Sequence, residues 1–175
     1  YTGEDGFELI VPSEAGMELW NALLEAGQPF GVQACGLGCR DTLRLEAAMP
    51  LYGHELNEET DPLTAGLDFA VKLEAADFVG RDALRNIAAS PTGKVRVGLE
   101  LEGKRIAREG AEIFSSDQSV GEVTSGTFSP TLQKAIAMGY VDASISETGS
   151  EFEIDIRGKR HAAKVVDLPF YKRSK

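Results

Sequence analysis

The sequence predicts an α+β fold in its first half and a small antiparallel β-barrel in its second half. Apolar residues recur at helical spacing in several segments before residue 90. After residue 93 the apolar residues instead alternate with polar ones, as they do in half-buried strands. Between the two regions, Ser90-Pro91-Thr92-Gly93 combines residues that favour turns. We therefore expect one domain at 1–90 and a second at 91–175.

Short strands and helices are expected to alternate in the first region. The apolar run at 7–11, FELIV, follows a glycine-rich turn and predicts a buried strand. Ser13 is expected to be the N-cap of the next helix, which Gly27 ends. A second strand is expected at 30–34. The apolar face of the helix consists of residues at helical spacing: Met17, Trp20, Leu23 and Leu24.

The rest of the first region continues this pattern. A helix is expected at 36–49, where Pro50 would stop it because proline cannot continue a helix. Residues 50–66 are rich in Gly, Pro, Asn and Thr and predict a loop. A further strand is expected at 67–73, and a further helix at 77–89.

The second region has the pattern of an all-β domain. Val95, Val97, Leu99 and Leu101 alternate with polar residues or glycine, which predicts a strand buried on one face. Several short strands at such regular spacing favour a small antiparallel barrel. The other strand candidates, separated by Gly, Ser, Asn or Asp, are 111–114, 120–125, 135–141, 151–156 and 162–166.

Composition narrows the class of protein. With 175 residues and 42% apolar residues, the chain can bury a sizeable core. The 18 basic and 28 acidic residues give a formal charge of -10, which argues against general binding of nucleic acids or anionic membranes. No apolar run approaches the roughly 18 residues of a membrane helix, and no signal peptide is visible. Because the chain starts at Tyr1, we expect it to be a piece of a longer protein.

Two glycine-containing motifs match phosphate-binding patterns only in part. Residues 98–105 (GLELEGKR) match most of G-x-x-x-x-G-K-[ST], but Arg105 replaces the final hydroxyl residue and strand alternation continues through the motif. Residues 36–38 (GLG) open a helix, but Asp41 stands at the third glycine position and would repel a pyrophosphate. We expect a strand and its turn at the first motif and a helix entry turn at the second.

Cysteine and histidine give no metal or catalytic site. Cys35 and Cys39 are too few for a disulfide scaffold and fit a reducing compartment. Zinc is not expected, because a site needs three or four ligands and no further Cys or His pair lies nearby. His54 and His161 have no obvious partners in the sequence, so we assign no catalytic histidine.

Three charged residues are candidates for ligand contacts. Arg40 and Arg44 lie four residues apart on the expected helix, a mildly repulsive spacing, so at least one should find an acceptor elsewhere. A guanidinium offers a planar fork of donors that suits carboxylate or carbonyl oxygens. Glu8 lies inside the FELIV run, where a buried carboxylate would need a paired donor. That donor could be an arginine or the donor edge of a ligand.

The sequence resembles the C-terminal half of the glycine cleavage system T protein, an aminomethyltransferase. Six segments occur in the order found in that family and together span nearly the whole chain. They are YTGEDGFE at 1–8, GLGCRDTLRLEAAMPLYGHEL at 36–56, DFVGRDAL at 77–84, GEVTSGTFSPTL at 121–132, IAMGYV at 136–141 and LPFY at 168–171.

The resemblance implies a fold, a reaction and a set of contacts. The chain would be part of a three-lobed fold with folate in its central channel. The parent would transfer a one-carbon unit from the aminomethyl-lipoyl H protein to tetrahydrofolate, with release of ammonia. The residues matched to folate contacts are Glu8, against the pterin, Arg40 and Tyr171. Arg44 is expected to be structural.

The resemblance also implies what the chain lacks. The family's catalytic aspartate lies in the N-terminal half, so we assign no catalytic residue here and expect the piece alone to be inactive. Cys39 and Ala48 replace residues that are often Ala and Gly in relatives, with little expected effect.

Several alternatives share the resemblance. They are a related folate-dependent demethylase, the folate domain of a dimethylglycine- or sarcosine-oxidising enzyme, a non-catalytic relative used in iron–sulfur assembly, and an inactive structural fragment. The cysteine-containing signature of the iron–sulfur relative is not found. The expected location is the bacterial cytoplasm, or the mitochondrial matrix in a eukaryote.

Overall fold

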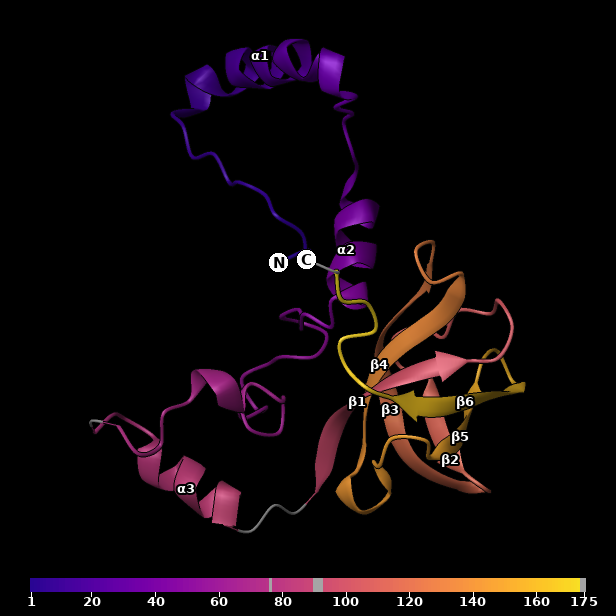
Figure 1. Ribbon diagram of the computed structural model, residues 1–175. Coiled ribbons are helices and arrows are strands. Elements are labelled where there is room, and N and C mark those ends of the chain that lie inside the picture. Colours follow the sequence, from indigo (N-terminus) through magenta and orange to yellow (C-terminus); the bar gives the residue numbers. More distant parts are fainter. Residues whose placement is uncertain (76, 90–92, 174–175) are drawn as a thin grey trace.

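Six antiparallel strands close into a barrel in the second half of the chain. A computed structural model describes residues 1–75, 77–89 and 93–173 (Figure 1). The strands neighbour one another in the order β1-β4-β3-β2-β5-β6, and β6 pairs with β1 to close the barrel. This confirms the expected barrel and each of its strands. Their bounds are β1 Lys94–Leu101, β2 Glu112–Ser115, β3 Gln118–Ser129, β4 Lys134–Asp142, β5 Glu151–Asp155 and β6 Arg160–Val166.

The barrel interior is a single apolar core. Alternate residues of the strands point into it, as the period of two predicted. Leu99, Ile113, Val123, Val141 and Ile154 are fully buried there. The barrel is therefore filled by side chains.

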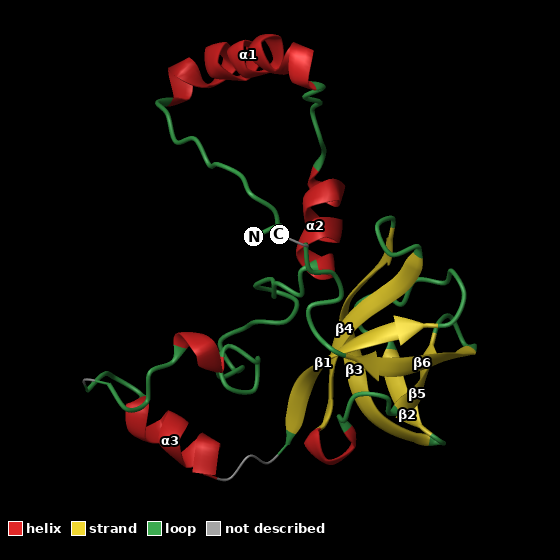
Figure 2. Cartoon of the chain, in the orientation of Figure 1, coloured by secondary structure: helices red, strands yellow, loops and turns green. Residues whose placement is uncertain are grey.

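Helices and irregular segments make up the first half (Figure 2). The three expected helices are confirmed, each somewhat shorter than predicted. Residues 50–66 form turns, as expected. The helix bounds are α1 Gly16–Gly27, α2 Leu37–Glu46 and α3 Arg81–Ala89, and single 3-10 turns lie at Ser13–Ala15, Gln28–Phe30, Asp68–Ala70 and Ala143–Ile145.

The three strands expected in the first half are wrong. Residues 7–11, 30–34 and 67–73 form no strand, although their apolar composition favoured burial. A strand requires neighbouring backbone to pair its N–H and C=O groups, and no described strand pairs with these segments. Phe7 and Ile10 are each 96% exposed. In the run at 7–11 the apolar pattern is present, but its side chains remain largely exposed in the described structure.

Helix boundaries also differ from the prediction in two places. Ser13 is not an N-cap: it lies inside a 3-10 turn, and its hydroxyl donates to the Glu14 carboxylate at 3.4 Å. Helix α2 ends at Glu46, before Pro50 is reached. It ends because Ala48 adopts a left-handed conformation with φ 56, and the Met49 N–H donates back to the Arg44 carbonyl at 2.8 Å.

The C-terminal tail packs on the outside of the barrel through Gly98. A Cβ built at Gly98 would lie 2.5 Å from Leu168 Cδ2 and 3.1 Å from Phe170 Cε1. Glycine in β1 therefore makes room for the tail. The strand and turn expected at 98–105 are confirmed in place of a phosphate loop, since β1 ends at Leu101 and a turn follows it. The expected domain boundary at 90–93 falls largely on Ser90–Thr92, which lie outside the described residues.

Within the described chain, no helix is long and apolar enough to span a membrane.

Candidate functional site

Both ends of the chain meet beside helix α2 (Figure 1). The Arg40 guanidinium stacks on the Tyr1 ring, 4.2 Å from its centroid, and the Tyr1 hydroxyl donates to the Pro50 carbonyl at 3.2 Å. Gly3 passes so close to the end of the helix that a Cβ there would lie 2.8 Å from Ala47 Cβ. These contacts hold residues 1–3 against α2 and its following turn.

A groove of about 560 Å³ lies where the two ends meet. Tyr171 is half-buried beside it, and its N–H donates to the Glu46 carbonyl at 2.9 Å. Arg173 bridges the termini, with its Nη1 2.9 Å from an Asp5 carboxylate oxygen and 3.4 Å from one of Glu4. The residues that line the groove are Gly3, Asp5, Ala47, Met49, Pro169, Tyr171, Lys172 and Arg173.

The structure brings two of the three sequence-predicted contacts to this region. Tyr171 lines the groove, and Arg40 lies beside it through its stack on Tyr1. Glu8 does not behave as predicted: it is exposed, and it forms no hydrogen bond or ion pair with any described residue. The expected burial was wrong because the strand that should have enclosed Glu8 is absent.

Sequence reasoning missed Arg173. The sequence did contain a signal for a basic ligand contact near the C-terminus, because a second basic side chain closely follows Tyr171 in a chain of net charge -10. Its contact with Asp5 depends on the meeting of the two termini, 168 positions apart, which no local pattern predicts.

Arg44, one turn after Arg40 in α2, is buried and anchors the helix to the barrel. Its side chain is 1% exposed and donates to Asp41 at 2.8 Å, to Glu55 at 2.8 Å and to Ser125 at 2.7 Å. A fourth donor contact reaches the Met49 carbonyl at 3.3 Å. The structural role expected for Arg44 is confirmed, and so is the expectation that one arginine of the pair finds acceptors elsewhere.

Glu55 is the buried carboxylate that balances Arg44. Burial opposes its ionisation, but hydrogen bonds from Ser125 and Thr124, the Leu51 N–H and the Arg44 charge outweigh that effect. Together they hold the pKa of Glu55 below its ordinary value. The carboxylate is therefore charged at neutral pH and fixes the turn after α2 onto β3.

A second buried carboxylate, Glu46, joins α2 to the end of β3. It accepts hydrogen bonds from the Ser129 hydroxyl at 2.5 Å and the Thr131 hydroxyl at 2.9 Å. Thr42 and Thr127 add a contact at 3.5 Å. The segments at 36–56 and 121–132, prominent in the sequence, therefore owe much of their pattern to one buried polar interface between helix and barrel.

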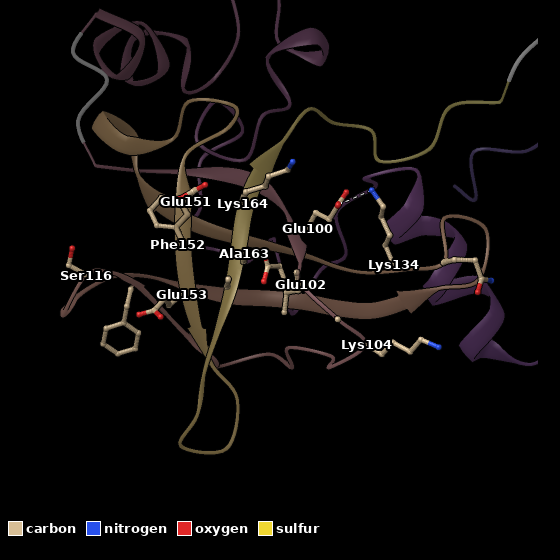
Figure 3. A pocket seen from close by; sticks show the side chains of 15 residues that line it. Glu100, Glu102, Lys104, Ser116, Lys134, Glu151, Phe152, Glu153, Ala163 and Lys164 are labelled. Carbon is tan, nitrogen blue, oxygen red and sulfur yellow. Dashed lines mark hydrogen bonds and ion pairs between the residues drawn. The ribbon is translucent and has the colours of Figure 1, made fainter.

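A separate groove of about 790 Å³ opens on the barrel, away from the chain ends (Figure 3). The figure shows Glu100 facing Lys134, whose Nζ lies 2.8 Å from the carboxylate. Both glutamates and lysines line this groove, so its charges favour no single ligand class. The labelled charged residues are Glu100, Glu102, Lys104, Lys134, Glu151, Glu153 and Lys164.

Histidine and cysteine contribute no centre that fits a metal. His54 Nδ1 lies 3.0 Å from the Glu109 carboxylate, on the surface. Cys35 and Cys39 are exposed free thiols. Among the residues that the structure describes, no group of three or more His, Cys, Asp or Glu side chains is placed to hold a metal ion.

The chain matches two family models. Residues 94–172 match the glycine cleavage T-protein C-terminal barrel domain, and residues 1–75 match the GCVT N-terminal domain. The barrel match coincides with the closed barrel and most of its tail, and the other match covers α1, α2 and the groove residues that precede residue 50.

Curated relatives and a solved structure extend the similarity. Proteins named aminomethyltransferase from Symbiobacterium thermophilum and Thermosynechococcus vestitus are 51% and 53% identical, over 98% and 99% of this chain and 46% of each relative. A crystal structure of the glycine cleavage system aminomethyltransferase T from Bartonella henselae matches with a TM-score of 0.91 and 37% identity, covering 98% of this chain and 48% of that one. The chain thus spans about half the length of the relatives it matches. It belongs to the glycine cleavage T-protein family.

Proposed function

We propose that the chain forms the folate-contacting and barrel part of an aminomethyltransferase. The whole enzyme would move a one-carbon unit from the aminomethyl-lipoyl arm of the H protein to tetrahydrofolate and release ammonia. The main support is the near-complete match of this chain to aminomethyltransferases at about half identity. The groove between the chain ends adds a place where cationic and aromatic side chains gather around α2.

Glu8, Arg40 and Tyr171 are proposed to contact the folate. A carboxylate accepts two parallel hydrogen bonds, so Glu8 suits the amide N–H and amino group of a pterin. Exposure of Glu8 supports this assignment, because no described residue competes for its oxygens. The Arg40 fork suits carbonyl or carboxylate oxygens, and its stack on Tyr1 restricts its orientation. We add Arg173 as a second cation for the carboxylate end of the ligand.

These residues would bind and position the ligand, and they leave the proton transfers to other groups. Catalysis of this kind depends largely on holding folate N5 near the methylene carbon while water is excluded. We assign no catalytic residue to residues 1–175. The acid–base aspartate would come from the N-terminal half of the enzyme, so this piece alone is proposed to be inactive.

An N-terminal half is also the proposed partner of the exposed apolar surface. Phe7, Ile10, Met17, Phe30 and Leu37 are each more than two-thirds exposed, and all precede or begin α2. Exposure of so many large apolar side chains is typical of a surface that another body covers. The H protein is the proposed second partner. The relatives named here are bacterial, which supports a cytoplasmic location; a eukaryotic source would place it in the mitochondrial matrix.

Isothermal titration calorimetry with tetrahydrofolate on the intact protein tests the proposal. Glu8→Ala and Arg40→Ala should each weaken binding by roughly 1.5–3 kcal/mol, because each removes a charged hydrogen-bonding partner. Glu14→Ala and Arg157→Ala are matched controls, since both residues are exposed and lie away from the groove. These controls should bind as the unsubstituted protein does. Unchanged affinity in both Glu8→Ala and Arg40→Ala would refute the folate assignment.

A further inference from the structure

Arg96, in β1, joins the barrel to the turn at 47–50 that follows α2. Its Nη1 donates to the Ala48 carbonyl at 2.9 Å, and its Nε donates to the carbonyl of the buried Ala65 at 2.7 Å. The Met138 sulfur lies 3.1 Å from the same Nη1. The Arg96 side chain is half-buried beneath these segments. One guanidinium thus attaches two separate loop segments to a single strand of the barrel.

Tyr140, in β4, holds the other end of the same loop. It is the register partner of Arg96 across the β1–β4 pair, and such partners lie side by side on one face of a sheet. The Tyr140 hydroxyl donates to the Glu55 carbonyl at 2.9 Å. The loop that begins at Ala48 and reaches Glu55 is therefore attached at both ends to one position on the barrel.

The turn at 47–50 also carries the contact that orients Arg40. The Pro50 carbonyl accepts a hydrogen bond from the Tyr1 hydroxyl at 3.2 Å, and the Arg40 guanidinium stacks on that same Tyr1 ring. Met49, in the turn, lines the groove between the chain ends. Because the Tyr1 hydroxyl is bound to this turn, the position of the turn sets the position of the ring on which Arg40 rests.

We propose that Arg96 is a positioning residue for the folate contact of Arg40. It holds the Ala48 carbonyl, the turn holds Tyr1, and Tyr1 holds Arg40. A planar guanidinium suits this task, because its donors point in fixed directions and can hold two carbonyls at once. Hydrogen bonds from a charged donor are also stronger than those between neutral groups. The effect on folate binding rests on the proposed function; the hold of Arg96 on the turn does not.

Hydrogen exchange on the intact protein tests the hold on the turn. Arg96→Met keeps a side chain of similar length but removes its donors, so mass spectrometry should show faster exchange in peptides that cover 47–53. Val165→Ala is the matched control: it removes two methyl groups from the barrel core, away from the turn, and should leave exchange at 47–53 unchanged. Unchanged exchange at 47–53 in Arg96→Met would overturn the proposal.

A double-mutant cycle measured by calorimetry with tetrahydrofolate tests the action through Arg40. In the intact protein, Arg96→Met should weaken binding roughly tenfold when Arg40 is present, but less than about twofold in the Arg40→Ala background. The reason is that a positioning residue acts only through the side chain that it positions. Val165→Ala should bind as the unsubstituted protein does, although it lowers stability.

Two results of the cycle would overturn the positioning role. One is an equal loss of affinity on Arg96→Met in both backgrounds, and the other is no loss in either background. If the unsubstituted protein does not bind tetrahydrofolate, the proposed function fails instead, and the exchange measurement still decides whether Arg96 holds the turn.

Discussion

At the scale of single residues, two arginines four positions apart have opposite roles. Arg40 is exposed and stacks on Tyr1, whereas Arg44 is buried and bound by carboxylates and a hydroxyl. The spacing of the two arginines predicted that at least one of them would need an acceptor. Only the resemblance to the T-protein family assigned the expected ligand contact to Arg40 and the structural role to Arg44. Two of the acceptors of Arg44, Glu55 and Ser125, lie 11 and 81 positions away in the sequence, so no local pattern could have named them.

Replacing Glu55 tests the buried ion pair. Because the pKa of Glu55 is lowered in the folded protein, its stabilising contribution is complete above its ordinary value near 4.5 and is lost as the pH falls through the folded value. Glu55→Gln should reduce the free energy of unfolding at pH 7 by about 3–5 kcal/mol, since it leaves Arg44 buried without its partner. Urea unfolding at pH 7 and pH 3 should show that this difference shrinks in acid.

The control for Glu55 is a surface carboxylate. Glu109 is 53% exposed, and His54 is the one described residue with which it pairs, so Glu109→Gln should change the free energy of unfolding by about 0–1 kcal/mol. A Glu55→Gln effect of that same size would contradict the buried pair.

Ala48 offers a second test at a single residue. A left-handed φ of 56 costs a residue with a Cβ about 1–2 kcal/mol of stability. Glycine avoids that cost, but it makes the unfolded chain more flexible, which lowers stability by about 0.4–1 kcal/mol. Ala48→Gly should therefore raise the free energy of unfolding by roughly 0.5–1 kcal/mol in chemical denaturation. Ala47→Gly, one residue earlier and at a negative φ, should lower it. Equal effects of the two substitutions would show that backbone conformation at Ala48 is not decisive.

At the scale of elements, the barrel strands could be predicted and the strands of the first half could not. The barrel encloses its own core, so one side of β1 or β4 faces that core and the other side faces outward, as the alternation in the sequence predicts. The apolar run at 7–11 carries the same kind of signal, but it pairs with no strand among the described residues. Of the three predicted contacts, Tyr171 lines the groove and Arg40 stacks on Tyr1, while Glu8 is exposed because its expected strand is missing.

The interface between α2 and β3 provides a prediction for pairs of elements. Glu46 and Ser129 are both buried and directly hydrogen-bonded. A double-mutant cycle with Glu46→Ala and Ser129→Ala should give a coupling energy of about 0.5–3 kcal/mol by urea denaturation. The exposed pair Glu100 and Lys134 should couple by no more than about 1 kcal/mol. Additive effects of Glu46→Ala and Ser129→Ala would contradict a shared buried contact.

At the scale of the whole molecule, the two halves of the chain differ in how complete their packing is. The barrel has a closed core, and α2 with the C-terminal tail packs on its outside through Leu45, Met138 and Leu168. Helix α1 and its flanking segments extend away from the barrel with their apolar side chains exposed (Figure 1). This unequal packing agrees with a chain that spans about half the length of its relatives.

Reconstitution of the reaction from two separate halves tests the central claim most directly. Residues 1–175 are mixed with the N-terminal half of a relative, such as the Symbiobacterium thermophilum aminomethyltransferase, and supplied with aminomethyl-loaded H protein and tetrahydrofolate. We predict that methylenetetrahydrofolate forms only when both halves are present, and that Arg40→Ala in this chain lowers the rate at limiting folate. Full activity of residues 1–175 alone would contradict the account, as would a stable complex of both halves that neither binds tetrahydrofolate nor transfers the one-carbon unit.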